Sequence, residues 1–217
     1  MLERLRVGPI GENAYIILAG DTCILVDPGD EAERIFSFVD SRDLVPAMII
    51  ATHGHLDHTA AIPQLLSFWK ERGIEVPLAA HREDADYFGA KSEETNRRLF
   101  ESIRAQGYFK AFWRAIPTPD IWLSDGDALP GCQYRVIHSP GHTRGSLCLY
   151  DESASILVSG DTLFRDGVGR TDGPDSDPAA LEASLGRLFR LPSGTRVFPG
   201  HGDESTIGRE SGSIAAI

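Results

Sequence analysis

Three of the seven histidines of this chain fall within six positions, from His53 to His58, together with one aspartate. Seven histidines spread evenly over 217 residues would put far fewer than one in such a window, so chance is a poor explanation. A neutral imidazole is the commonest metal ligand among side chains, and an aspartate adds a hard oxygen donor. The segment therefore predicts a metal site.

The spacing within the segment separates its donors into two pairs. The apolar run 47–52 is typical of a strand, so His53 and His55 leave its end two residues apart and can project to one side. Asp57 and His58 are adjacent at the start of the next helical period, and their side chains diverge toward a second point. The segment therefore predicts two ions rather than one.

Three further candidate donors stand just past strand-like runs elsewhere in the chain, which are His142 after 134–139, Asp161 after 155–160 and His201 after 196–200. Loops at strand ends converge on a sheet edge, where α/β proteins commonly place their sites. Five histidines and two aspartates are enough for two ions that share one carboxylate and one solvent oxygen. The predicted ligands are His53, His55, Asp57, His58, His142, Asp161 and His201.

The elements that must position these donors are visible as alternating strands and helices. Apolar runs bounded by Gly, Pro, Asp or Ser predict strands at 14–19, 22–27, 47–52, 76–81, 134–139, 146–151, 155–160 and 196–200. Helical periods occupy 31–40, 61–70 and 177–190. The mixture predicts a layered α/β or α+β fold, and the length fits one domain over 1–217.

The segment 91–116 is helical in period and rich in aromatic residues. It lies within a predicted helical insertion at about 85–120, between two strands. We expect a helical hairpin that is broken near Gly107 and packs on the core. The alternative is that its apolar surface forms a wall of a substrate pocket or the interface of a homodimer.

Charge and composition exclude several classes of protein. The net charge of −11 repels nucleic acid over most of the surface. No apolar run approaches the roughly 20 residues of a membrane span, and the first residues do not form a secretory signal. We therefore expect a cytoplasmic protein with a small-molecule substrate, without nucleic acid or membrane partners.

Four motifs around the candidate donors resemble those of the metallo-β-lactamase superfamily, in the order typical of that family. They are T-H-x-H-x-D-H at 52–58, P-G-H-T at 140–143, S-G-D-T at 159–162 and P-G-H-G at 199–202. The resemblance implies an αββα sandwich, in which two mixed sheets pack face to face with helices outside.

The same resemblance implies a role for each donor. It assigns His53, His55 and His142 to a first metal, and it assigns Asp57, His58 and His201 to a second metal. Asp161 would bridge the two ions. Asp27, in the V-D-P-G of 26–29, would hold a ligand imidazole in orientation without binding metal itself.

Within the superfamily, the stretches 159–177 and 198–210, the second of which ends in T-I-G-R-E, are similar to short bacterial members of the glyoxalase II group, the hydroxyacylglutathione hydrolases. Longer members carry a C-terminal helical domain that helps to hold glutathione, and we expect that domain to be absent here. Asp172 also stands where the longer members have a tyrosine. Arg170 stands in the place of a basic residue that contacts the glutathione moiety, and it is a predicted substrate contact.

The predicted chemistry is hydrolysis of a thioester such as S-lactoylglutathione. Two divalent ions lower the pKa of a shared water from about 15.7 toward about 7, which gives a metal-bound hydroxide that attacks the carbonyl carbon. A thiolate leaves without a strong general acid, because the pKa of a free thiol is only about 8.5. Asp57 would orient the hydroxide or accept its proton. Zinc is the expected ion, and iron or manganese also suits these ligands.

Other functions use the same ligands. A persulfide dioxygenase shares the G-R-T-D of 169–172 and binds one iron through two histidines and an aspartate. Another superfamily hydrolase, of esters or lactones, or a metal-binding scaffold without turnover would also fit. Metal content and oxygen uptake distinguish the dioxygenase from the hydrolases.

Overall fold

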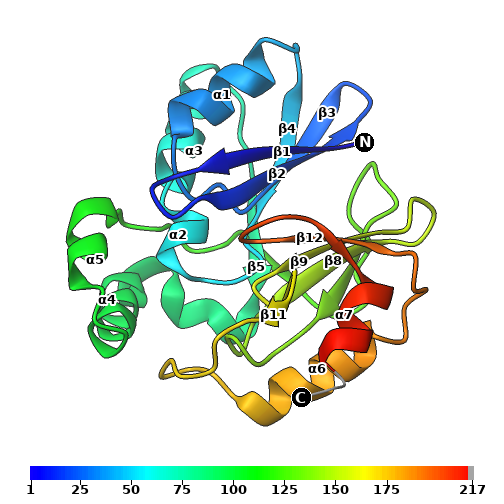
Figure 1. Ribbon diagram of the computed structural model, residues 1–217. Helices are drawn as coiled ribbons and strands as arrows, with labels where there is room; N and C mark the ends of the chain where they lie inside the picture. Colours follow the sequence, from blue (N-terminus) through cyan, green and yellow to red (C-terminus); the bar gives the residue numbers. More distant parts are fainter. Residues whose placement is uncertain (215–217) are drawn as a thin grey trace.

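The computed structural model describes residues 1–214, and Figure 1 shows their arrangement. The first sheet has six strands in the order β1-β2-β3-β4-β5-β6. The three strands at its beginning are antiparallel, and β3 to β6 are parallel. The strands are β1 (Leu2–Val7), β2 (Glu12–Ala19), β3 (Thr22–Val26), β4 (Val45–Ile50), β5 (Leu78–His81) and β6 (Ile121–Leu123).

The second sheet has five strands in the order β13-β12-β9-β8-β7. Only the β9–β12 pair is parallel, so both sheets are mixed. The strands are β7 (Arg135–His138), β8 (Leu147–Asp151), β9 (Ile156–Gly160), β12 (Arg196–Pro199) and β13 (Ser205–Thr206). A separate two-stranded ribbon is made by β10 (Leu163–Phe164) and β11 (Gly167–Val168).

The alternation of side chains along the strands explains why the two sheets pack together. In β2, Tyr15 and Ile17 enter the core between the sheets, whereas Ile16 enters the core on the outer face of the first sheet. In β9, Val158 faces the first sheet and Leu157 faces outward. Because successive side chains of a strand point to opposite faces, each of these strands is buried on both sides.

Helices cover both outer faces (Figure 1). The apolar stripes of α1 (Ala32–Asp40) and α3 (Ile62–Glu71) pack on the first sheet through residues such as Ile35 and Leu65. The second sheet is covered by α6 (Pro178–Leu188) and α7 (Ile207–Ile214). The predicted αββα sandwich is therefore confirmed. Within residues 1–214 there is no helix with the length and hydropathy needed to cross a bilayer.

The eight predicted strands correspond to β2, β3, β4, β5, β7, β8, β9 and β12, and the three predicted helices correspond to α1, α3 and α6. The sequence did not predict β1, β6, β10, β11 or β13. β1 is an edge strand with several charged and exposed residues, so it lacks the apolar run that marks an interior strand. The other four are only two or three residues long.

The segment between β5 and β6 is helical, as expected. It contains the 3-10 turns η1 (Arg82–Tyr87) and η2 (Gly89–Lys91) and the helices α4 (Ser92–Ser102) and α5 (Gln106–Phe112). The predicted break near Gly107 is confirmed and lies at 103–105, where Arg104 adopts a left-handed φ of 59°. Gly107 lies in the first turn of α5, where backbone amides need no partner within the helix.

Candidate metal centre

The loops that carry the seven donors meet where the two sheets come together. The backbone amide of Leu147, at the start of β8, donates to the carbonyl of Thr52 at 2.7 Å and ties the loop after β4 to the second sheet. The amide of Gly200 donates to the carbonyl of Gly160 at 2.8 Å and joins the loops after β12 and β9. Donors more than one hundred residues apart in sequence are thereby brought to one place.

The first group consists of His53, His55 and His142. One ring nitrogen from each lies within 4.8 Å of the others, and all three residues are buried. Nε2 of His142 is 3.0 Å from Nδ1 of His55. The three imidazoles assigned to the first metal therefore converge on one point.

The second group consists of Asp57, His58 and His201, whose donor atoms also lie within 4.8 Å of one another. Nε2 of His201 is 3.2 Å from Oδ2 of Asp57, and Nε2 of His58 is 3.6 Å from the same oxygen. Asp57 and His201 are 15% and 26% exposed in their side chains, so this group faces solvent more than the first.

Asp161 stands between the two groups. Its Oδ1 is 3.4 Å from Nε2 of His58, and its Oδ2 is 3.7 Å from Nε2 of His142 and 3.8 Å from Nε2 of His201. One carboxylate thus faces a histidine of the first group and two of the second. This is the position expected of a bridging ligand.

Three buried atoms in this cluster have no hydrogen-bond partner among the described residues: His53 Nε2, His58 Nε2 and Asp161 Oδ1. Buried polar groups normally have partners, and an unpaired one costs about 1–3 kcal/mol. All three belong to the predicted ligand set, and nitrogen and carboxylate donors suit a divalent cation. The residues therefore fit the metal ions that the sequence implies.

The protonation of His53, His55 and Asp57 agrees with this use. Burial, and then the neighbouring imidazoles, lower the pKa of His53 well below its ordinary value, and burial and His142 lower the pKa of His55 to about 3. Burial alone would raise the pKa of Asp57, but His58 and a hydrogen bond from His201 bring it below the ordinary value. Neutral imidazoles and an ionised carboxylate are the forms that bind metal. Burial lowers the pKa of His58, but Asp161 and the neighbouring carboxylates raise it well above its ordinary value, so a metal ion must displace a proton from this imidazole.

Hydrogen bonds to residues outside the donor set fix the orientation of two of these imidazole rings. Nδ1 of His58 donates to Oδ2 of Asp27 at 3.0 Å, and the backbone amide of Thr52 donates to Oδ1 of Asp27 at 2.6 Å. Nδ1 of His142 donates to the backbone carbonyl of Arg170 at 2.9 Å. In His58 and His142 the lone pair of Nε2 is thus left for a ligand role, and Asp27 stands where the sequence predicts it.

Asp84, which the sequence did not single out, joins two of the donor loops. It is buried, and its Oδ2 accepts from the amide of Gly54 at 2.9 Å and from Oγ1 of Thr143 at 2.8 Å. Its Oδ1 accepts from the amide of Gly145 at 2.7 Å. The only sequence signal is an acidic residue just past a predicted strand, and Glu83 and Asp86 share that signal.

Three residues at the start of β2 lie behind the second group and were also missed. Asn13 donates through Nδ2 to the carbonyls of Pro199 and Gly202, both at 2.9 Å, and so holds the loop that carries His201. Tyr15 donates its hydroxyl to the carbonyl of Pro199 at 2.8 Å. Glu12 is buried 3.8 Å from Nδ1 of His58, and burial raises its pKa. The sequence signal that could have found these residues is the Glu12-Asn13 pair directly before an apolar run.

Gly200 shows why a glycine follows β12. A Cβ atom at this position would lie 2.3 Å from Oδ1 of Asp161 and 2.7 Å from Cε1 of His58. Both distances are shorter than any normal contact, so a side chain here would push two predicted ligands away. Glycine is therefore required by close approach rather than by backbone conformation.

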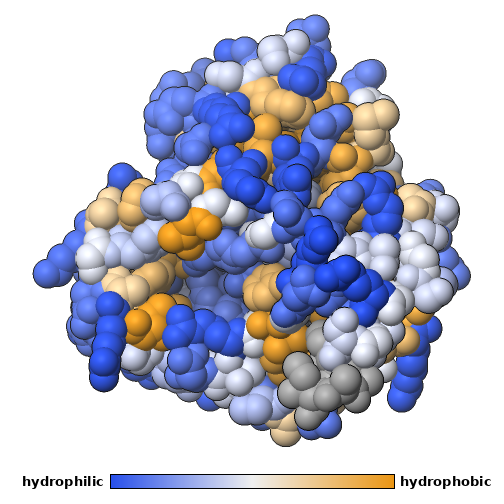
Figure 2. Space-filling view, in the orientation of Figure 1, coloured by the Kyte–Doolittle hydropathy of each residue, from blue (hydrophilic) through white to orange (hydrophobic). Residues whose placement is uncertain are grey.

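The donors form one side of a cavity of about 420 Å³. Figure 2 shows a recess in this face of the molecule with hydrophobic side chains on its rim. The cavity is lined by His55, Asp57, His142, Asp161 and His201, by Arg170, and by the apolar or aromatic residues Ile10, Leu99, Phe100, Ile103, Ala105 and Tyr108. The segment 91–116 thus both packs on the core and lines the pocket, so its two predicted roles are combined.

Arg170, the predicted substrate contact, lines this cavity but is already paired. Its Nε donates to Oδ1 of Asp172 at 2.6 Å, and its Nη2 donates to Oδ2 at 2.8 Å. The two side chains form a bidentate ion pair on an exposed loop. The positive charge of the Arg170 guanidinium is therefore already paired with the carboxylate of Asp172.

The model of the metallo-beta-lactamase superfamily matches residues 7–201, most of the chain and all seven donors. This chain belongs to the metallo-β-lactamase superfamily. The hydroxyacylglutathione hydrolase GloC of Haemophilus influenzae is 33% identical over 96% of this chain and 94% of its own length.

Two solved structures extend the comparison. TTHA1623 in a di-iron-bound form is 35% identical, covers 96% of this chain and 96% of its own length, and has a TM-score of 0.77. The B3 metallo-β-lactamase BLEG-1 is 30% identical, covers 98% of this chain and 97% of its own length, and has a TM-score of 0.82. The superfamily members similar to this chain thus include proteins named for different substrates, and family membership does not identify the substrate.

Proposed function

We propose that this member of the superfamily is a metal-dependent hydrolase that cleaves thioesters. The observation that carries the proposal is the convergence of two donor groups on one shared carboxylate, beside a cavity that is open to solvent. The relative named hydroxyacylglutathione hydrolase supports thioesters as the substrate class.

In this proposal His53, His55 and His142 hold one ion, Asp57, His58 and His201 hold the other, and Asp161 serves both. When bound, two divalent cations would lower the pKa of a water and stabilise the oxyanion that forms at the substrate carbonyl. Asp57 lies at the cavity and is ionised because of its neighbouring imidazoles. Its carboxylate would orient the attacking water and accept the proton that the water loses.

The remaining residues of the cavity favour a leaving group that departs as an anion. Among the residues 1–214 that line the cavity, the titratable side chains outside the donor set are those of Tyr108 and Arg170. Burial raises the pKa of the Tyr108 phenol, and a guanidinium does not give up a proton near neutral pH, so neither is an effective general acid. A thiolate needs no such acid, whereas an alkoxide or an amide nitrogen does. This contrast favours thioesters over esters and β-lactams.

Zinc is the predicted metal, and iron is the principal alternative. The ligand set of five imidazoles and two carboxylates suits both ions. The di-iron-bound neighbour, at 35% identity over 96% of this chain, supports iron. Metal analysis of protein purified without added metal distinguishes the two.

The test uses protein loaded with zinc or iron, and compares a thioester with the oxygen ester of the same acyl group and with a β-lactam. We expect kcat/KM for the thioester to exceed that for the ester by at least about tenfold, because only the thiolate leaves without an acid. Equal rates for the ester, or a preference for the β-lactam, would contradict the proposal.

The persulfide dioxygenase remains the rival function, and oxygen uptake separates it. One iron per chain, oxygen consumption on glutathione persulfide and an absence of thioester cleavage would exclude hydrolysis. Two metals per chain and hydrolysis without oxygen uptake would support it.

A further inference from the structure

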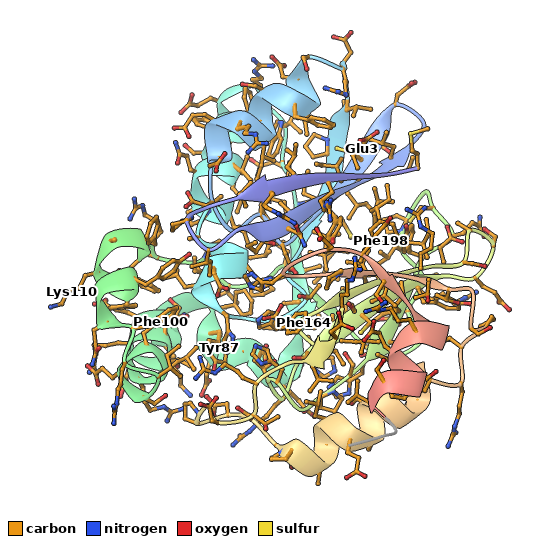
Figure 3. All side chains as sticks on the ribbon, in the orientation of Figure 1. Glu3, Tyr87, Phe100, Lys110, Phe164 and Phe198 are labelled. Atoms are coloured by element: carbon orange, nitrogen blue, oxygen red, sulfur yellow. The ribbon has the colours of Figure 1, made fainter. Side chains whose placement is uncertain are left out.

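The cavity beside the metal centre has an apolar wall. Leu99, Phe100 and Ile103, at the end of α4, and Tyr108, in α5, face it, and Ile10 adds apolar surface from the turn between β1 and β2. Figure 3 labels Phe100 on α4. Ile10 is 51% exposed, so its side chain is accessible from solvent at the edge of the cavity.

This wall is preformed by packing. Leu99 and Phe100 are only 4% and 6% exposed, because they also belong to the core on this side of the first sheet. The ring of Phe100 stacks on that of Tyr108 with centroids 5.5 Å apart, and the ring of Tyr108 stacks on that of Phe112 at 4.5 Å. A wall that is already ordered loses little conformational entropy when an apolar group binds to it.

The loop 171–177 closes against this wall. Asp175 accepts from Nη2 of Arg98 on α4 at 3.0 Å and from the hydroxyl of Tyr87 at 3.2 Å. A Cβ at Gly173 would be 3.4 Å from Cδ1 of Leu99, which shows that the loop touches α4. The loop therefore fixes α4 beside the donors.

Cationic groups are scarce at the cavity. Arg170 is the only arginine or lysine among the residues that line it, and Asp172 already binds its guanidinium through both oxygens. Lys110 on α5 points away from the protein (Figure 3). Glutathione carries two carboxylates, and carboxylates are typically bound by free arginine or lysine side chains. The cavity offers apolar surface instead.

We propose that this cavity receives an apolar acyl group, and that the chain prefers thioesters of aliphatic or aromatic acids over hydroxyacylglutathione. The inference rests on the proposed thioester hydrolysis and names its substrate class. Each methylene buried against the wall would raise kcat/KM by about fourfold, until the cavity is full.

The first experiment compares acetyl, butanoyl and hexanoyl thioesters of one small neutral thiol, N-acetylcysteamine, with S-lactoylglutathione. We expect kcat/KM to rise at least about tenfold from acetyl to hexanoyl, and the hexanoyl thioester to exceed S-lactoylglutathione. A flat series, or a preference for S-lactoylglutathione, would overturn the inference while leaving thioester hydrolysis in place.

A matched pair of variants connects this preference to the wall. Ile103→Asn places an amide in the cavity, and we expect the hexanoyl-to-acetyl ratio of kcat/KM to fall by about fivefold or more. Ile121→Asn makes the same change on β6, at a residue that is 36% exposed and does not line the cavity, and should leave the ratio unchanged. The ratio is insensitive to differences in folding or metal content. Equal effects of the two substitutions would contradict the proposed contact.

Binding of nonhydrolysable thioethers tests the cavity without turnover. Calorimetry should show that the S-hexyl thioether of N-acetylcysteamine binds the metal-loaded protein at least about tenfold more tightly than the S-ethyl thioether. If no thioester is hydrolysed but this difference is present, the proposed function fails and the apolar site stands. Equal dissociation constants would overturn the apolar site.

Discussion

The metal centre and the α4–α5 wall lie on the same cavity but are held in different ways. The donors are positioned by polar contacts, such as Asp27 on His58 and Asp84 on the amide of Gly54. The wall is held by aromatic and aliphatic packing, with stacked rings and few polar contacts at the cavity itself.

This difference suits the metal centre to the reaction and the wall to the selection of the substrate. Hydrogen bonds with short distances fix the direction of a lone pair, which metal binding requires. Apolar packing fixes only a shape, which is enough to recognise a hydrocarbon group. The loops at the strand ends would therefore determine the reaction, and the segment between β5 and β6 would determine which acyl group is accepted.

The strongest way to break the centre alone is to remove the carboxylate between the two donor groups. Asp161→Ala leaves His58, His142 and His201 without the carboxylate that faces all three, through Oδ1 for His58 and Oδ2 for the other two. We expect metal content to fall and hydrolysis to drop by at least about 10³-fold, because both ions lose a shared ligand. Elemental analysis and kcat/KM measured on the same preparation check this.

The control is Asp40→Ala, which removes an exposed carboxylate from the end of α1, where it pairs with Arg72. This variant should keep its metal and its activity. If Asp161→Ala kept both as well, the bridging role of Asp161 would be wrong.

Crowding the centre should have the next largest effect. Gly200→Ala puts a methyl group 2.3 Å from Oδ1 of Asp161, so either the loop or the carboxylate must move. We expect metal affinity to fall by about 10- to 100-fold, as when the support of a ligand is disturbed. Competition with a chromogenic chelator measures it.

Gly186→Ala provides the comparison for that variant, because an added Cβ in α6 meets nothing within 4 Å. It should raise the free energy of unfolding by about 0.5–1 kcal/mol and leave metal affinity unchanged, since alanine is the better residue within a helix. Equal metal affinities in the two variants would mean that the loop at Gly200 moves to make room for the methyl group and leaves Asp161 in place.

Asp84→Asn tests the polar support of the centre without touching a donor. An amide cannot accept all three hydrogen bonds from Gly54, Thr143 and Gly145, and its NH₂ group would face a donor. We expect the free energy of unfolding to fall by about 2–3 kcal/mol and metal affinity to fall by about tenfold. Urea denaturation and metal titration measure the two effects.

Asp86→Asn changes an exposed neighbour that pairs with Lys91, and should cost less than about 1 kcal/mol. Loss of stability without loss of metal affinity in Asp84→Asn would show that Asp84 supports the fold but not the donor loops.

The sequence was sufficient to predict which side chains converge, because their chemistry is unusual and each lies just past a recognisable strand. Histidines at 53, 55 and 58 are rare as a group, and His142, Asp161 and His201 each follow a strand that alternation or apolar content reveals. The order of the strands in each sheet depends on long-range pairing. This order was not predicted from the sequence, and only the sandwich of two mixed sheets followed from the family resemblance.

The supporting residues could not be predicted, because their roles depend on contacts between distant segments. Asp84 reaches Thr143 and Gly145 across about sixty positions, and no local pattern distinguishes it from its acidic neighbours. Glu12 is buried although glutamate is usually exposed. The reversal at Arg104 takes place at a residue that is neither glycine nor proline, although its φ is left-handed.

The smallest expected effect concerns the exposed ion pair of Arg170 and Asp172, whose arginine lines the cavity. If Asp172 occupies the guanidinium that glutathione would use, Asp172→Ala should lower KM for S-lactoylglutathione by about threefold, whereas Arg170→Ala should change it little. KM for acetyl-N-acetylcysteamine, which carries no carboxylate, is the internal control and should not change in either variant. In Arg170→Ala, a large rise in KM for S-lactoylglutathione without a change for the neutral thioester would contradict this prediction. It would show that Arg170 leaves Asp172 to bind glutathione and that the apolar wall does not select the substrate.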